Sequence, residues 1–249
     1  LVQAILAHAM STLKILICGG GNGAHAIAGL AAGLIDVEAR WLLLRRDDAM
    51  RINEVMGDAL EVVRPGNTVT KSRPAMVTND ASKAVPGVHF IIFSMPAVAH
   101  HEYFERIAPY LEPKSVVCGM PGQFGFQFQA SALLGEQGKS CQILSFETMP
   151  WVCRIKTFGR QVEILGCKQR VSVSVNPSTC SPSTPDHLAF MQRLLGPAPV
   201  LELADNCLVP NLFTVVHPPI LYGQWKSWEG EPVSEKPLLY QSINEVAAD

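Results

Sequence analysis

One stretch near the amino terminus constrains the fold of this chain more than any other. Residues 14–18 (KILIC) have the apolar character of a short buried strand, and the glycine-rich segment Gly19-Gly20-Gly21-Asn22-Gly23 follows as a turn. Small residues then run from Ala24 to Gly33, which is typical of a helix that packs closely on a sheet. A strand, a glycine turn and a helix in this order form a unit that holds the diphosphate of a dinucleotide at the helix amino terminus.

The positions within the turn have separate roles in such a unit. Gly19 permits the tight turn after the strand, and Gly21 lets a diphosphate approach the backbone because it has no β-carbon. Ala24 allows helix and strand to pack together, and Asn22 suits either a left-handed backbone position or a contact to phosphate. The cofactor-binding residues expected in the loop are Gly19, Gly20, Gly21, Asn22, Gly23 and Ala24. A purely structural turn is the alternative.

Composition narrows the class of protein. The 249 residues are 48% hydrophobic and 17% charged with a net charge of −2, enough for one large domain or one domain plus part of another. The near-neutral balance without a basic stripe argues against nucleic-acid binding, and no apolar run is long enough to cross a bilayer. The seven cysteines are scattered without metal-ligand spacing, so we expect reduced thiols, a cytoplasmic location and no metal site.

Strands and helices alternate through the first 146 residues. The expected strands after the first are residues 37–44, 88–93, 115–119 and 141–146, and the expected helices are residues 47–60, 80–85, 100–111 and 124–137. This alternation predicts an α/β fold, a Rossmann-type doubly wound parallel sheet of about six strands with right-handed crossovers and helices on both faces.

Two β segments fall outside the alternation. Pro65-Gly66-Asn67 predicts the turn of a short two-stranded excursion, and Phe158-Gly159-Arg160 predicts the turn of a hairpin over residues 154–165. We expect residues 171–175 to extend the β region of that hairpin. A surface loop, a helix and a strand are then expected over residues 176–185, 186–195 and 200–203.

The character of the chain changes near Asn206, after which it is largely apolar but interrupted by prolines. We therefore expect a dinucleotide-binding domain over residues 10–205 and the incomplete beginning of a second domain over residues 206–249. Residues 1–9 precede Met10 and lack a basic leader, so a frayed extension, or translated sequence upstream of a start at Met10, is expected there rather than a signal peptide.

Residues that follow the strands are candidates for ligand contacts, because ligands of doubly wound sheets lie at the carboxyl ends of the strands. Residues 45–48 (RRDD) follow the second strand, where an arginine such as Arg45 or Arg46 favours a 2′-phosphate and a carboxylate would accept hydrogen bonds from the adenosine ribose, although a solvated loop with a helix cap is an equally good interpretation. Pro96 ends the strand over residues 88–93 and could lie against a nicotinamide, or it could simply stop the strand. His100 and His101 point to different helix faces, and we interpret them as surface or capping residues.

Three segments of the chain resemble the opine dehydrogenase family, in particular its octopine-dehydrogenase-like members. The segments are residues 18–25 (CGGGNGAH), 145–156 (SFETMPWVCRIK) and 216–223 (VHPPILYG), and the resemblance extends over nearly the whole chain from Met10. It implies an enzyme that condenses an amino acid with an α-keto acid, usually pyruvate, and reduces the imine with NADH. It also implies a helical second domain, and a role in reoxidising NADH when oxygen is short.

The resemblance also implies site residues. His217 matches the catalytic histidine of the family, and an imidazole that titrates near neutral pH suits the protonation step of a reduction. A structural histidine beside two prolines is the alternative. Gln123, Glu147 and Cys153 match positions around the amino-acid substrate, and Glu147 hints at a cationic one such as arginine. Cys153 could equally be a packed thiol.

Two departures from the family pattern affect what is expected. Arg45 and Arg46 stand where NADH-preferring relatives are more neutral, so NADPH stays possible beside NADH. The family continues beyond residue 249 with the arginine that grips the keto acid and the aspartate that orients the histidine, so we expect dinucleotide binding with poor turnover or none. The alternatives are a related dehydrogenase acting on glycerol 3-phosphate or ketopantoate, and a dinucleotide-binding fragment without catalysis. The particular amino acid and the oligomeric state stay open.

Overall fold

The computed structural model describes residues 12–45, 47–122, 125–176 and 184–204, together with 219, 222–223 and 226–231. The chain divides into two compact units, Leu1–Val209 and Pro210–Asp249. Every helix and strand named below lies in the first unit. In the described part of the second unit, the indole N–H of Trp228 donates to the carbonyl of Glu231 at 2.8 Å. The domain division expected after residue 205 falls outside the described residues.

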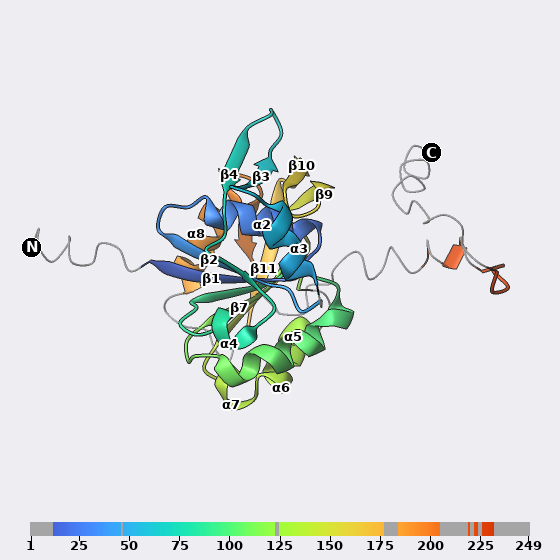
Figure 1. The fold of residues 1–249 in the computed structure, drawn as a ribbon. Coiled ribbons are helices and arrows are strands. Elements are labelled where there is room, and N and C mark those ends of the chain that lie inside the picture. Colours follow the sequence, from blue (N-terminus) through green and yellow to red (C-terminus); the bar gives the residue numbers. More distant parts are fainter. Residues whose placement is uncertain are drawn as a thin grey trace, which may run out of the picture. The chain divides into compact units, whose positions relative to one another are not determined.

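A sheet of eight strands forms the centre of the first unit, within the described residues (Figure 1). In spatial order its strands are β12 (Val200–Leu203), β11 (Arg170–Val175), β8 (Gln142–Phe146), β7 (Val116–Gly119), β6 (Phe90–Phe93), β1 (Leu13–Cys18), β2 (Val37–Leu42) and β5 (Met76–Thr78). The six strands from β8 to β5 are parallel, whereas β11 runs antiparallel to β8 and β12 runs with β11. The predicted Rossmann-type α/β sheet is therefore present.

Helices cover both faces of this sheet, and successive side chains of a strand alternate between the two layers. On β1, Ile15 and Ile17 pack into one core cluster while Leu16 and Cys18 pack into the other. The first layer contains α2 (Asn22–Ala32), α3 (Asp48–Val55) and α8 (Thr184–Leu195), and the second contains α4 (Ala81–Ala84), α5 (His100–Ile107), α6 (Phe126–Leu133) and α7 (Gly135–Gly138). The two helix layers lie above and below the sheet in Figure 1.

A second sheet packs over α2, on the side away from the main sheet (Figure 1). Its order is β4 (Val69–Ser72), β3 (Leu60–Val63), β10 (Gln161–Cys167) and β9 (Trp151–Thr157). The β3–β4 pair is the predicted excursion and the β9–β10 pair is the predicted hairpin, both antiparallel. The parallel pairing of β3 with β10, which joins them into one sheet, was not predicted.

Other local expectations require correction. Residues 171–175 do not extend the hairpin, because β11 pairs with β8 in the main sheet and buries Val171, Val173 and Val175 in its core. Helix α3 ends at Val55 rather than near Leu60, since Gly57 takes a positive φ of 60° and Leu60 already starts β3. The edge strand β5 and the short 3-10 helices Ala97–Ala99 and Ala108–Tyr110 were also missed.

Candidate functional site

The glycine loop lies where the order of the parallel strands reverses. Strand β1 has β2 on one side and β6 on the other, and the loop follows its last residue, Cys18. In open α/β sheets this reversal opens a crevice at the carboxyl ends of the strands, and ligands bind there. The loop is therefore at the position where a dinucleotide binds in folds of this type.

Three positions of the loop require glycine for different reasons. Gly19 has a φ of +114°, and a β-carbon there would lie 2.6 Å from the carbonyl oxygen of Ser94. A β-carbon on Gly23 would lie 2.5 Å from both Met149 Cε and Ser94 Oγ. A β-carbon on Gly21 would meet no atom of the described chain within 4 Å. Packing within the protein explains Gly19 and Gly23, whereas Gly21 leaves open space for something outside the chain.

The amino terminus of α2 is open in the same place. Gly21 is the N-cap residue in an extended conformation, and among the described residues no side-chain hydrogen bond caps the helix. The first N–H groups of a helix have no intrahelical partner and carry partial positive charge, so they favour an anion. Asn22 is the first helical residue, and its Oδ1 accepts a hydrogen bond from the Ile155 N–H of β9 at 2.9 Å. Asn22 is therefore not left-handed, and its side-chain oxygen anchors the loop to the second sheet.

Neighbouring strand ends complete the edge of the crevice. Ser94 follows β6, is buried, and its hydroxyl lies 3.9 Å from Met149 Sδ, which follows β8. Pro96 is exposed and is the N-cap residue of the 3-10 helix Ala97–Ala99. Segments distant in sequence thus meet at the loop: Gly23, Ser94 and Met149 lie within contact distance of one another.

Two of the substrate candidates, Glu147 and Cys153, lie within the described residues. The carboxylate of Glu147 accepts a hydrogen bond from the Ser172 N–H of β11 at 3.2 Å. Burial lowers the pKa of Lys168, and the charge of Glu147 partly opposes that shift, so the two groups interact. Cys153 is 4% exposed, belongs to the core, and burial raises the pKa of its thiol to about 11. Its thiol is therefore protonated at neutral pH.

The structure gives less information about the remaining residues proposed from the sequence. Arg45 follows β2 and is exposed. Arg46, Gln123 and His217 lie outside the described residues, so their roles rest on the sequence alone.

The interpretation of His100 is wrong. The residue is 1% exposed, and its ring lies edge-on to Phe126 with 5.2 Å between ring centroids. Burial lowers the pKa of His100, so it is a neutral core residue rather than a surface or capping residue. His101 is exposed, as expected, and lies 3.3 Å from Glu105.

Two residues behind the loop were missed by the sequence interpretation. His25 is fully buried, and one ring nitrogen lies 3.0 Å from the carbonyl oxygen of Gly21. Trp41 on β2 is also fully buried and donates its indole N–H to the carbonyl of Gly19 at 2.7 Å. The only available sequence signal was a histidine inside an apolar helix directly after the glycines.

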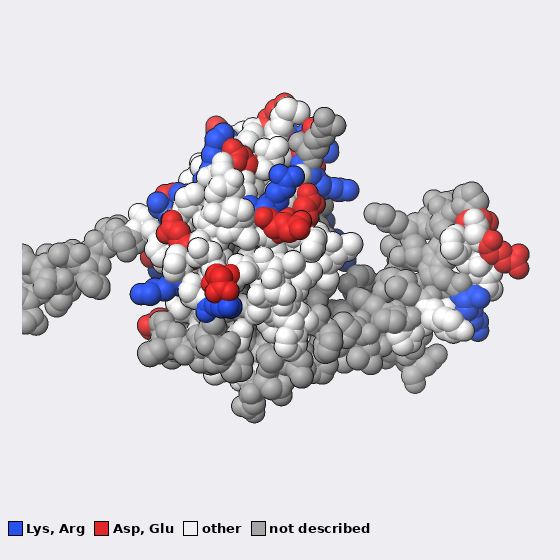
Figure 2. All heavy atoms as spheres, turned by 90° about the horizontal axis from the view of Figure 1, so that it is seen from below, with Lys and Arg blue, Asp and Glu red and all other residues white. Residues whose placement is uncertain are grey.

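Other features of the described residues do not compete with this site. Basic and acidic side chains are interspersed on the face drawn in Figure 2. No group of three or more histidine, cysteine or acidic side chains among the described residues is suited to a metal ion. No helix in the described ranges is both long and apolar enough to span a membrane. A hollow of about 500 Å³ is lined by none of the loop glycines; its lining residues are Ala49, Met50, Asn53, Glu54, Val77, Thr78 and Asn79.

The sheet order, the open helix terminus and the unoccupied space at Gly21 define a Rossmann-type nucleotide-binding fold. Comparison with known proteins then identifies the chain as a homologue of the octopine, opine and tauropine dehydrogenases over most of its length. Octopine dehydrogenase of Mizuhopecten yessoensis is 44% identical over 245 residues, covering 96% of this chain and 61% of that enzyme. Tauropine dehydrogenase of Arabella iricolor is 35% identical over 243 residues, covering 94% and 61%. No protein-family model matches the chain.

Solved structures agree with the sequence relatives. Octopine dehydrogenase with NADH and L-arginine superposes with a TM-score of 0.80 at 43% identity, covering 96% of this chain and 60% of that one. The same enzyme with NADH and pyruvate gives a TM-score of 0.81 at 43% identity, covering 96% and 62%. A ketopantoate reductase of Ralstonia eutropha, 15% identical with a TM-score of 0.58, shares the fold alone. The chain thus spans about 60% of the length of its relatives.

Proposed function

We propose that this chain carries the dinucleotide site of an NADH-dependent opine dehydrogenase, which joins an amino acid to an α-keto acid such as pyruvate. The single observation that supports it most is the open loop. Gly21 leaves space beside the uncapped amino terminus of α2, in a chain 43% identical to an octopine dehydrogenase solved with NADH. The homology favours this reaction over glycerol 3-phosphate or ketopantoate chemistry, because the similarity to ketopantoate reductases is confined to the fold.

The loop residues fit a bound dinucleotide. We propose that the first N–H groups of α2 donate to the diphosphate, and that Gly21 admits it because no side chain occupies that space. Gly19, Gly20, Gly23 and Ala24 shape the loop around it. Pro96 borders the nicotinamide end, and Arg45 and Arg46 border the adenosine ribose, where they leave NADPH as a second cofactor.

The overall reaction balances without a metal ion. The amine and the keto acid lose water to form an imine, and NADH supplies the hydride that reduces the imine carbon. We propose that His217 supplies the proton for the imine nitrogen, because an imidazole is protonated and deprotonated near neutral pH. Gln123, Glu147 and Cys153 are proposed to border the amino-acid substrate. The proposed compartment is the cytoplasm, where the enzyme reoxidises NADH when oxygen is short; the dispersed cysteines support this.

Steady-state assays on the product of the complete gene test the proposal. NADH oxidation should require both pyruvate and an amino acid from a panel of cationic, small and sulfonate-bearing candidates. Oxidation with pyruvate alone would indicate a hydroxy-acid dehydrogenase instead. In the same protein, His217→Gln should lower kcat by roughly a hundredfold or more while NADH affinity stays unchanged. Unchanged turnover in His217→Gln would remove the proposed role of this residue.

A further inference from the structure

His25 connects the glycine loop to the turn between β9 and β10. Its Nδ1 lies 3.0 Å from the Gly21 carbonyl oxygen, and the Gly159 N–H lies 3.1 Å from its Nε2. The ring packs edge-on against Trp41 with 4.7 Å between centroids, and Phe158 lies 5.2 Å away. These contacts hold the imidazole in one orientation directly behind the loop.

The two hydrogen bonds define the protonation state of this ring. A backbone N–H can only donate, so Nε2 must accept from Gly159 and carries no hydrogen. A carbonyl oxygen can only accept, so Nδ1 must carry the hydrogen and donate it to Gly21. His25 is therefore the neutral Nδ1–H tautomer, and both of its nitrogens are used within the protein.

Trp41 bonds to the carbonyl group at the start of the glycine turn. Its indole N–H donates to the Gly19 carbonyl oxygen at 2.7 Å. The peptide groups that follow Gly19 and Gly21 thus both have their oxygens bonded to ring N–H donors of the interior, and the Gly21 oxygen also accepts the first helical bond, from the His25 backbone N–H at 3.1 Å. In a peptide group the N–H points away from the carbonyl, so holding the oxygens inward directs the following N–H groups outward.

We propose that His25 and Trp41 are positioning residues of the phosphate-binding loop, which orient its N–H groups for the diphosphate. This inference rests on the proposed dinucleotide site. A glycine-rich loop has unusual backbone freedom, and ordering it at the moment of binding would reduce affinity. The two ring donors order it in advance. The bond from the Ile155 N–H to Asn22 attaches the helix start to the same hairpin, so the second sheet supports the loop from behind.

Substitutions at His25 separate its two hydrogen bonds. His25→Phe keeps an aromatic ring but removes both bonds, whereas His25→Asn retains a donor near the Nδ1 position and His25→Gln retains an acceptor near the Nε2 position. NADH and ADP-ribose, which share the diphosphate, are titrated against each variant of the 249-residue chain. His25→Phe and His25→Gln should weaken both ligands by roughly tenfold, and His25→Asn should weaken them less. Trp41→Phe should weaken both ligands in the same way.

The matched control is His187→Phe. His187 also bonds through a ring nitrogen, to Gln142, and lies edge-on to Phe90 at 5.5 Å. Phe90 is the first residue of β6 and Gln142 is the first residue of β8, so His187 lies at the end of the sheet opposite the glycine loop. Its substitution should therefore leave the affinities for NADH and ADP-ribose unchanged.

The outcomes distinguish this inference from the proposed function. If the unsubstituted chain binds neither ligand, the dinucleotide site itself is wrong and the inference falls with it. If it binds both, and His25→Phe binds them equally well, only the positioning role is overturned. A loss confined to NADH, with ADP-ribose unaffected, would also contradict it. Should His25→Phe fail to fold, ¹⁵N resonances of the imidazole still decide, because an Nε2–H tautomer would exclude the proposed pair of bonds.

Discussion

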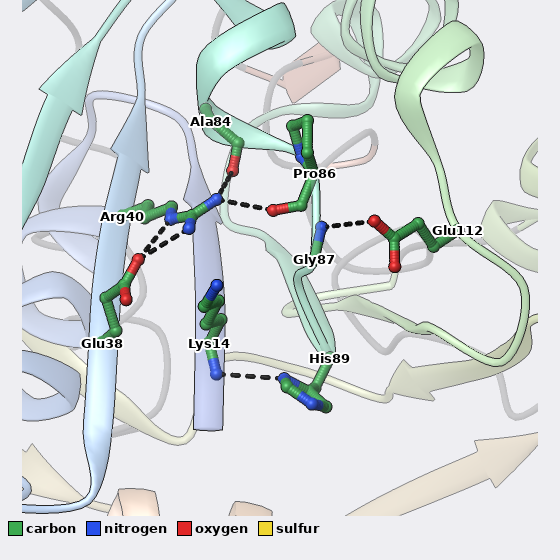
Figure 3. Close-up of polar contacts among 8 residues, drawn as sticks. All are labelled: Lys14, Glu38, Arg40, Ala84, Pro86, Gly87, His89 and Glu112. Carbon is green, nitrogen blue, oxygen red and sulfur yellow. Dashed lines mark hydrogen bonds and ion pairs between the residues drawn. The ribbon is translucent and has the colours of Figure 1, made fainter. Parts of the chain in front are cut away.

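We call the side of the main sheet where its parallel strands begin the amino edge, and the side where they end the carboxyl edge. Both edges carry hydrogen-bonded polar groups, but the two sets differ in whether all their partners lie within the chain. At the amino edge, Arg40 donates from Nε to Glu38 at 2.7 Å (Figure 3). Its Nη1 donates to the carbonyls of Ala84 at 3.1 Å and Pro86 at 2.7 Å. Close by, Glu112 accepts from the Gly87 N–H at 2.7 Å. At the carboxyl edge, the interior rings take the loop carbonyls and leave the helix amino terminus uncapped.

The difference teaches how to separate a structural polar cluster from a binding site. Arg40 is 8% exposed, and its donors reach a carboxylate and two carbonyls of the same chain, so its partners are complete without a ligand. The loop holds its acceptors inward and presents its remaining donors to the space beside Gly21. Changes at the amino edge should therefore affect stability, and changes at the open part of the loop should affect binding.

Gly21→Val should produce the largest effect on NADH affinity. If it did not, the comparison between the two edges of the sheet would fail. The extended backbone of Gly21, with φ −84° and ψ −174°, is open to valine, and a β-carbon there would meet no atom of the described residues within 4 Å. We expect NADH affinity to fall by about a thousandfold or more, with the free energy of unfolding changed by less than about 1 kcal/mol. Calorimetric titration and thermal unfolding measure the two quantities. Retained affinity would exclude the proposed position of the diphosphate.

Gly19→Ala is the contrasting variant within the same loop. Its positive φ and the 2.6 Å approach to the Ser94 oxygen predict a loss of folding stability that Gly21→Val does not show. If both variants lost stability equally, the distinction between packed and open glycines would be wrong.

Arg40→Met tests the opposite edge. The methionine keeps much of the apolar stem but leaves Glu38 and the Ala84 and Pro86 carbonyls without their donor. We expect the free energy of unfolding to fall by about 3 to 4 kcal/mol, measured by urea titration. NADH affinity of the folded protein should not change. A selective loss of affinity would show that the amino edge also serves the cofactor.

The pH dependence of stability tests whether the ring of His25 is buried in its neutral form. Burial lowers its pKa from 6.5 to about 4, although the Gly21 carbonyl and the charge of Asp48 partly oppose the shift. Because the unfolded chain binds this proton more readily, the destabilisation begins as the pH falls below 6.5 and is complete below about 4, amounting to about 3 kcal/mol. His25→Phe should remove this contribution, so the difference between the two stability curves isolates it from the carboxylates. Parallel curves would contradict the buried neutral ring.

The sequence predicted what depends on local pattern. The strand, glycine turn and helix of the loop, the alternation that follows and the two hairpin turns are all encoded by residues close together in the chain. Pairings between distant segments were not accessible in this way. Strand β11 reads as one more hairpin strand, and only its antiparallel register with β8 shows that it belongs to the main sheet.

The same limit applied to the site. The motif already separated Gly19, assigned to the turn, from Gly21, assigned to the approach of a diphosphate, but the contact that packs Gly19, the Ser94 carbonyl 75 residues beyond it, could not be predicted. His25 was visible within the motif, but its partner Gly159 lies 134 residues away. His100 was misread for a related reason, because the rings that bury it belong to β6 and α6 as well as its own helix.

The smallest expected effect concerns the border between the loop and the second strand. Arg45 is exposed after β2, so it would meet the 2′-phosphate of NADPH in water rather than in a closed pocket, and Arg46 is included because it adjoins Arg45 in the sequence. Exposed charge pairs contribute modestly, and the double variant Arg45→Ala/Arg46→Ala should weaken NADPH by roughly tenfold while leaving NADH within about twofold. Titrations at two salt concentrations check it, since the NADPH effect should shrink as salt screens the charges. An equal loss for both cofactors would mean that the arginines contact the diphosphate that NADH and NADPH share. The binding site for the diphosphate would then extend from the glycine loop to the end of β2.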